Sequence, residues 1–124
     1  MTKILIVEDD PDGQIVLKRL LAMEGISADI VSTGEAALKA LSELSYAGVI
    51  IDLGLPGIDG MSLVKQIRVN YSKDKLPCVA ITAYHNSSVR QEAQQMGFNA
   101  YYPKPIDLTQ FAGEIRVLLS NLDS

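Results

Sequence analysis

Residues 49–60 read VIIDLGLPGIDG, and this stretch decides the fold. A β-branched apolar run ends abruptly at the carboxylate of Asp52, and the glycines and proline that follow break regular structure. The pattern predicts a buried strand that brings Asp52 to the carboxyl edge of a sheet, where open α/β sheets bind ligands. A single aspartate at this place also suits an ordinary turn. Other residues have to decide between these two interpretations.

Length and composition limit the classes of protein that the chain belongs to. Its 124 residues suit one domain, large enough to bury a core without disulfides or a structural metal. The net charge of −4 argues against a general binder of nucleic acid or anionic membranes. The lone cysteine, Cys78, suits a reducing compartment, and neither a membrane span nor a signal peptide is evident. We therefore expect a cytoplasmic domain that binds neither nucleic acid nor membrane.

Short apolar runs alternate with amphipathic segments along the whole chain. Ser32 and Glu35 have the spacing of a capping box, and Gly25 and Gly97 are placed to end helices. Strand and helix alternation implies right-handed crossovers and a parallel sheet. The chain is thus predicted to be a flavodoxin-like, doubly wound α/β sheet of five strands, in the order 2-1-3-4-5, with five helices. The predicted strands are residues 4–7, 28–31, 49–51, 78–81 and 100–102.

In that strand order, polar residues at several strand ends meet at one edge. Glu8 and Asp9 follow the first strand, which neighbours the strand that ends in Asp52. Crowded carboxylates repel one another unless a cation neutralises them, and hard oxygen ligands suit Mg²⁺. Thr82 and Lys104 end the next two strands and would add a hydroxyl and a positive charge. The set is typical of a phosphoryl-transfer site with a carboxylate nucleophile.

The same motifs resemble the receiver domain of two-component response regulators, and the resemblance covers essentially the whole chain. The order and spacing of the motifs agree, although each motif alone is weak. They are ILIVEDDP at 4–11, IDLGLPGIDG at 51–60, ITA at 81–83 and YYPKP at 101–105.

The resemblance implies that Asp52 accepts a phosphoryl group from a phosphohistidine of a histidine kinase or histidine phosphotransfer protein. It implies that Asp9, Asp52 and the backbone carbonyl of Gly54 bind Mg²⁺, with Mn²⁺ able to substitute. Glu8 would act on the metal through water.

The resemblance also assigns Lys104 and Thr82 as contacts of the phosphoryl group. The bond between Lys104 and Pro105 would be cis, which is uncommon even for a bond before proline. Phosphorylation would draw Thr82 inward, Tyr101 would rotate inward, and the surface of the fourth helix, fifth strand and last helix would change for a downstream protein target.

Two positions depart from the commonest family pattern. Gly54 often has a larger counterpart that shields the phosphoryl group, and Tyr84 is bulky and aromatic. The resemblance implies that both tune the lifetime of phosphorylated Asp52. His85 is expected to be a solvated loop residue rather than a phosphodonor.

Two alternatives come from other classes of protein. The chain could be an interaction module of the same fold that works without phosphorylation. More remotely, DPDG at 10–13 resembles the nucleophile motif of haloacid-dehalogenase phosphatases, with Asp10 as nucleophile. We expect the chain to catalyse only its own phosphorylation and dephosphorylation, and no reaction on another substrate. Residues 1–124 are interpreted as one receiver domain without an output domain, stand-alone or cut from a longer protein, and a phosphorylation-dependent homodimer stays open.

Overall fold

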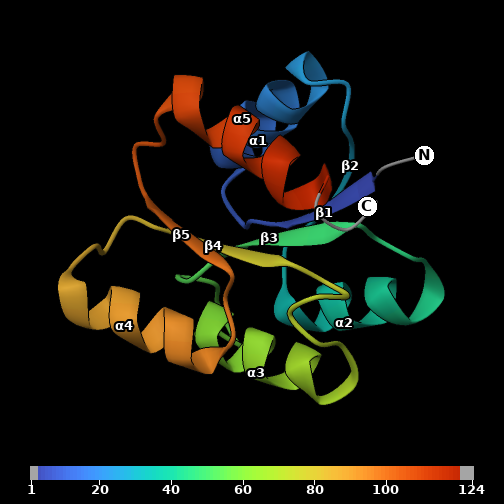
Figure 1. Ribbon diagram of the computed structural model, residues 1–124. Coiled ribbons are helices and arrows are strands. Elements are labelled where there is room, and N and C mark those ends of the chain that lie inside the picture. The colour runs from blue at the N-terminus through green and yellow to red at the C-terminus, as the bar shows by residue number, and fades with distance from the viewer. Residues whose placement is uncertain (1–2, 121–124) are drawn as a thin grey trace.

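Within residues 3–120, five parallel strands form one sheet at the centre of the molecule (Figure 1). The structure is a computed structural model that describes these residues, apart from the side chains of residues 108, 109 and 120. The strands lie in the order β2-β1-β3-β4-β5, so the predicted order is confirmed. They are β1 (Lys3–Val7), β2 (Ser27–Val31), β3 (Gly48–Asp52), β4 (Cys78–Thr82) and β5 (Ala100–Pro103).

Helices cover both faces of the sheet. Figure 1 shows α1 and α5 on one face and α2, α3 and α4 on the other. Each of the first four helices connects two parallel strands, as crossover connections require. None of the described helices is long and apolar enough to cross a membrane. The helices are α1 (Pro11–Met23), α2 (Gly34–Glu43), α3 (Gly60–Asn70), α4 (Ser87–Met96) and α5 (Leu108–Ser120).

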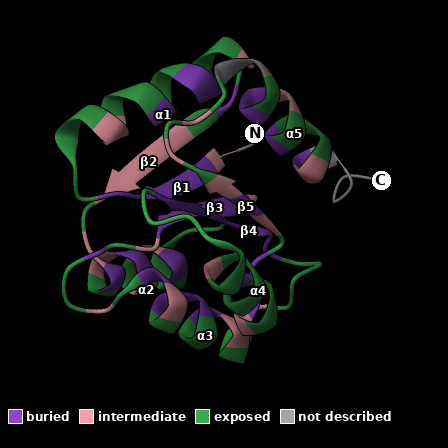
Figure 2. Cartoon of the chain, turned by 90° about the vertical axis from the view of Figure 1, so that its left-hand side faces the viewer, coloured by how far each residue is buried: buried purple, intermediate pink, exposed green. Residues whose placement is uncertain are grey.

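Alternate residues of the strands supply two separate cores. In β1, Leu5 and Val7 pack with residues of α2, α3 and α4, whereas Ile4 and Ile6 pack with residues of α1 and α5. Every residue of β3 and β4 is buried, and Figure 2 shows the buried sheet between helices whose outer faces are exposed. Burial on both faces explains why the strands read as continuous apolar runs. Polar groups are therefore left to the strand ends.

The start of α2 differs from the prediction by one residue. Thr33 is the N-cap, and its Oγ1 accepts a hydrogen bond from the N–H of Ala36 at 3.1 Å. The predicted capping box of Ser32 and Glu35 is therefore wrong. Ser32 instead accepts a hydrogen bond from the side chain of Gln14 in α1, at 3.3 Å.

A single arginine, Arg68, ties together the end of the sheet where β4 and β5 begin. It lies near the end of α3, and its guanidinium makes five hydrogen bonds, three of which share the two N–H groups of Nη1. Four go to backbone carbonyls and one to the side chain of Asn99, which also accepts from the N–H of Cys78 at 2.9 Å. The carbonyl partners are Gly97, Tyr71, Ser72 and Leu76, at 2.8–3.2 Å.

Candidate functional site

The carboxylates of Glu8, Asp9 and Asp52 come together because β1 and β3 are neighbours. The register pairs Val7 with Ile51, so the residues that follow the two strands emerge side by side. One carboxylate oxygen from each of the three residues lies within 4.8 Å of the others. The predicted acidic cluster is therefore present.

Lys104 reaches this cluster from the end of β5. Its Nζ lies 2.7 Å from Glu8 Oε1 and 2.9 Å from Asp52 Oδ2. The backbone N–H of Lys104 donates to the carbonyl of Thr82 at 2.8 Å, which fixes the lysine beside the end of β4. The peptide bond between Lys104 and Pro105 is cis. One ammonium group thus bridges two carboxylates of the cluster.

Glu8 and Asp52 respond differently to their shared environment. Glu8 is fully buried, and burial together with the hydrogen bond to Asp52 raises its pKa to about 7. Burial also opposes the charge of Asp52, but hydrogen bonds from Glu8, the Gly54 N–H and Lys104 lower its pKa. Burial likewise opposes the charge of Lys104, whose pKa is nevertheless raised by its bonds to both carboxylates. Near neutral pH, Glu8 is therefore about half protonated, while Asp52 stays ionised.

One oxygen of the cluster, Oε2 of Glu8, is buried without a donor among the described residues. When Glu8 is protonated, its carboxyl group donates the hydrogen bond to Asp52 that contributes to its raised pKa. When Glu8 is ionised, the oxygen calls for a cation. The donor set of three carboxylates therefore fits a hard divalent cation such as Mg²⁺.

Gly54 and Thr82 flank the carboxylate of Asp52. The N–H of Gly54 donates to Asp52 Oδ1 at 2.9 Å, and Gly54 itself is exposed. Thr82 is 2 % exposed, and its Oγ1 accepts from the N–H of Tyr84 at 3.0 Å. Tyr84 is 78 % exposed at the rim of the site. The site is thus open toward solvent on the Gly54 side.

Tyr101 differs from its expected starting position. From the sequence, Tyr101 is expected to turn inward on phosphorylation, but its side chain is already buried, 6 % exposed. Its hydroxyl lies 3.0 Å from Nδ1 of His85, in the loop between β4 and α4. His85 is exposed, as expected, but is not free of contacts. The change open to Tyr101 is therefore a change of its contacts with this loop.

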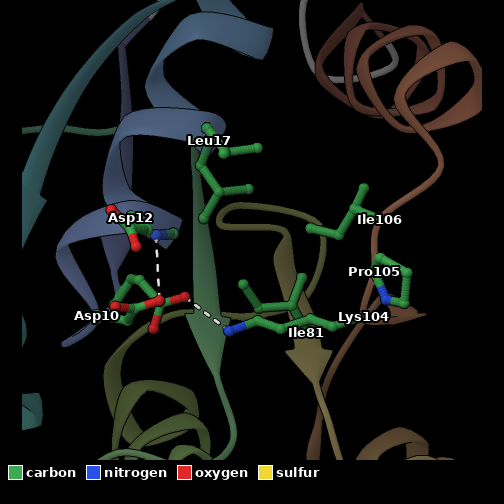
Figure 3. Close-up of a pocket in the computed structure, with 10 residues that line it drawn as sticks. Asp10, Asp12, Leu17, Ile81, Lys104, Pro105 and Ile106 are labelled. Atoms are coloured by element: carbon green, nitrogen blue, oxygen red, sulfur yellow. Dashed lines mark hydrogen bonds and ion pairs between the residues drawn. The ribbon is translucent and has the colours of Figure 1, made fainter.

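Asp10 lies apart from the acidic cluster and acts as a helix cap. Its Oδ2 accepts from the N–H of Gly13 at 3.3 Å, which identifies it as the N-cap of α1. It lines a largely apolar hollow of about 480 Å³ between α1 and the loop after β5 (Figure 3). Glu8 and Lys104 also line this hollow, whereas Asp52 does not, so the hollow adjoins the acidic cluster on the side away from Asp52.

Two residues that hold Glu8 in place were not predicted from the sequence. Gly13 passes so close to Glu8 that a Cβ atom there would overlap its Oε1. Gln14 donates from Nε2 to the backbone carbonyl of Glu8 at 2.7 Å. A glycine in the first turn of a helix was the available signal, because glycine disfavours helices unless close packing requires it.

The model of the family described as Response regulator receiver domain matches residues 4–116. The chain belongs to this family. Receiver domains of this family are signalling domains of two-component systems. The transcriptional regulatory protein PcoR of Escherichia coli is 32% identical over 119 residues, which are 96% of this chain and 52% of PcoR. The receiver domain thus corresponds to about half the length of that relative.

Solved structures agree with this assignment. A two-component response regulator from Clostridium difficile superposes with a TM-score of 0.92 at 28% identity, covering 100% of both chains. The receiver domain of the sensor histidine kinase PA1611 from Pseudomonas aeruginosa superposes with a TM-score of 0.83 at 29% identity, over 99% of this chain and 98% of that one. The PA1611 structure has a magnesium ion coordinated in its active-site cleft.

Proposed function

We propose that this receiver domain is a phosphorylation-activated switch in which Asp52 accepts a phosphoryl group from a phosphohistidine. The donor would be a histidine kinase or a histidine phosphotransfer protein. The observation that carries the proposal is the geometry of Lys104, which bridges Glu8 and Asp52 next to the carboxylate of Asp9. A nucleophilic carboxylate, a cation site and a mobile positive charge are what phosphoryl transfer needs.

The cation of the site would be Mg²⁺, with Mn²⁺ able to replace it. Asp9, Asp52 and the carbonyl of Gly54 would hold it, and Glu8 would act through water. When bound, Mg²⁺ supplies positive charge that neutralises the carboxylates and the phosphoryl oxygens. The clustering of the three carboxylates and the oxygen of Glu8 that lacks a donor support this assignment.

The residues of the chain would divide the transfer among them. An oxygen of Asp52 attacks phosphorus, the phosphorus–nitrogen bond of the phosphohistidine breaks, and the electron pair leaves with the imidazole. The lowered pKa of Asp52 keeps its carboxylate ionised for this attack. Lys104 exchanges a carboxylate for a phosphoryl oxygen, which its flexible stem allows. Hydrolysis by water later returns Asp52 to its free form, so the domain would act only on its own phosphorylation state.

The switch would lie on the side of α4, β5 and α5. Thr82 would turn its hydroxyl to the phosphoryl group, and Tyr101 would change its contacts with the loop after β4. The outer face of α4 is polar, with Gln91, Gln94 and Gln95 all exposed. A polar face suits a transient downstream protein target better than a permanent interface.

The test is the intact mass of the protein after incubation with Mg²⁺ and a small acyl phosphate. The wild type is expected to gain one labile phosphoryl group, which chelator prevents and which Asp52→Asn abolishes. Asp10→Asn is the matched control, because Asp10 is an acid of the same edge outside the cluster. No adduct on the folded wild type, with the acyl phosphate or with a phosphohistidine donor, would contradict the proposal and favour a phosphorylation-independent interaction module. An adduct lost in Asp10→Asn instead would favour the phosphatase alternative.

A further inference from the structure

Tyr101 is held by the loop between β4 and α4 through more than packing. Its hydroxyl meets Nδ1 of His85 at 3.0 Å. In the tautomer of His85 whose Nδ1 carries no proton, the tyrosine O–H donates to this nitrogen. The ring centroids of His85 and Tyr101 are 5.4 Å apart with a tilt of 44°. The guanidinium of Arg90 lies 5.7 Å from the centroid of the Tyr101 ring.

The same short loop begins at the phosphoacceptor edge. Thr82 ends β4, and Ile81 pairs with Asp52 in the sheet. The Oγ1 of Thr82 accepts from the N–H of Tyr84, so the side chain of Thr82 and the backbone just before His85 are joined by a hydrogen bond. Two residues separate Thr82 from His85. This hydrogen bond links the side chain of Thr82 to the backbone that leads to His85.

We propose that His85 is the positioning residue that carries the movement of Thr82 to Tyr101. The proposal rests on the proposed phosphorylation of Asp52 and adds to it a residue that touches neither the acceptor nor the cation. His85 provides a ring contact and a hydrogen-bond acceptor to one buried tyrosine. When the loop moves, the tyrosine either follows it or loses this hydrogen bond.

A purely structural role for His85 makes a different prediction. If the imidazole only fills space beside Tyr101, any ring of similar size serves equally well. If Nδ1 of His85 positions Tyr101, a ring without nitrogen at residue 85 cannot accept the hydrogen bond of the tyrosine. Asparagine can accept it, because its side-chain oxygen reaches nearly the same place as Nδ1. His85→Phe and His85→Asn therefore separate the two roles. His85 is exposed, so both variants are expected to fold.

The experiment follows Tyr101 by fluorine NMR in protein labelled with 3-fluorotyrosine. The chain has five tyrosines, and the resonance of Tyr101 is the one missing from Tyr101→Phe. Spectra are recorded with Mg²⁺, before and after acetyl phosphate, at equal occupancy of Asp52 by intact mass. Loss of one hydrogen bond changes an equilibrium constant about fivefold. We expect His85→Phe to weaken the phosphorylation-dependent shift of the Tyr101 resonance to that extent, and His85→Asn to restore most of it.

Failure of this inference and failure of the proposed function give different results. An adduct on Asp52 with a wild-type shift of Tyr101 in His85→Phe overturns the role of His85 alone. The same role is overturned if His85→Asn and His85→Phe weaken the shift equally, because the nitrogen is then unimportant. No adduct on the wild-type protein overturns the proposed function, and the switching role of His85 with it.

Discussion

Replacement of Glu8 by glutamine is expected to remove most of the pH dependence of folding stability between pH 5.5 and 8. Glu8 is fully buried, and its pKa is raised from 4.5 to about 7. The folded protein therefore holds the proton more tightly than the unfolded chain does. The stabilisation that this proton provides is complete below the unfolded pKa of 4.5 and is lost as pH rises through 7. The lowered pKa of Asp52 acts below its usual 3.8, outside this range.

The size of the effect follows from the two pKa values of Glu8. At 1.36 kcal/mol per pH unit, the interval from 4.5 to about 7 corresponds to about 3 kcal/mol in all. Between pH 5.5 and 8, the wild type should lose about 2 kcal/mol of its free energy of unfolding through this group. Glutamine has the same shape and no titrating proton, and Lys104 keeps its second partner, Asp52. The variant should therefore be the more stable protein at pH 8 and show a flatter profile.

The assay is urea unfolding of both proteins at pH 5.5 and pH 8, with chelator present so that no cation binds the cluster. Glu24→Gln is the matched control, because Glu24 pairs with Arg116 at the surface and lies outside the acidic cluster. It should leave the pH dependence of the wild type in place. Parallel pH profiles for the wild type and Glu8→Gln would refute the reasoning, since another group would then carry the effect.

Three further predictions concern the site and its supports. Gly13→Ala should destabilise the protein by about 1–3 kcal/mol in urea unfolding, because the new methyl group overlaps Glu8 Oε1. Gly113→Ala is the control and should stabilise the protein by about 0.5–1 kcal/mol, because no described atom lies within 4 Å of its Cβ position. Equal effects of the two substitutions would contradict crowding at Gly13. Gly54→Asn should lengthen the lifetime of phosphorylated Asp52 several-fold when followed by mass, because a Cβ at this position lies 3.6 Å from Asp52 Oδ1, and a shortened lifetime would count against shielding. Binding of Mg²⁺ at pH 7 should release about half a proton, because the cation displaces the proton of Glu8. Calorimetry should show this release as a heat of binding that depends on the buffer. A heat of binding that does not depend on the buffer would exclude this displacement.

The fold was predictable because the hydrophobic pattern and the strand ends agree. Strands buried on both faces leave continuous apolar runs, and alternation with helices leaves few possible topologies. The convergence of Glu8, Asp9 and Asp52 followed from that topology before any side chain was placed. The start of α2 was mispredicted because Ser32 and Thr33 are both good caps, and the contact of Ser32 with Gln14, 18 residues away, is not a local signal.

Other features of the site depend on three-dimensional proximity that no local pattern reveals. The contact between His85 and Tyr101 joins residues 16 positions apart, and the sequence around either residue does not indicate the contact. The same holds for the burial of Tyr101, which depends on how the loop after β4 lies over β5. The raised pKa of Glu8 could not be predicted from the sequence, because it depends on the burial of this carboxyl group and on its closeness to Asp52. Acid crowding could be expected from sequence, but not which acid keeps the proton.

The hydrogen bonds of Arg68 make the two ends of the domain mechanically unequal. At the end where β4 and β5 begin, one guanidinium fastens four carbonyls and the side chain of Asn99. At the opposite end, the loop that carries His85 is exposed from residue 83 to residue 88. Side-chain hydrogen bonds therefore cross-link one end of the sheet, whereas the loop beside Asp52 is open to solvent. If Asp52 is phosphorylated as proposed, we expect any backbone displacement to occur in the loop after β4 rather than at the end that Arg68 holds.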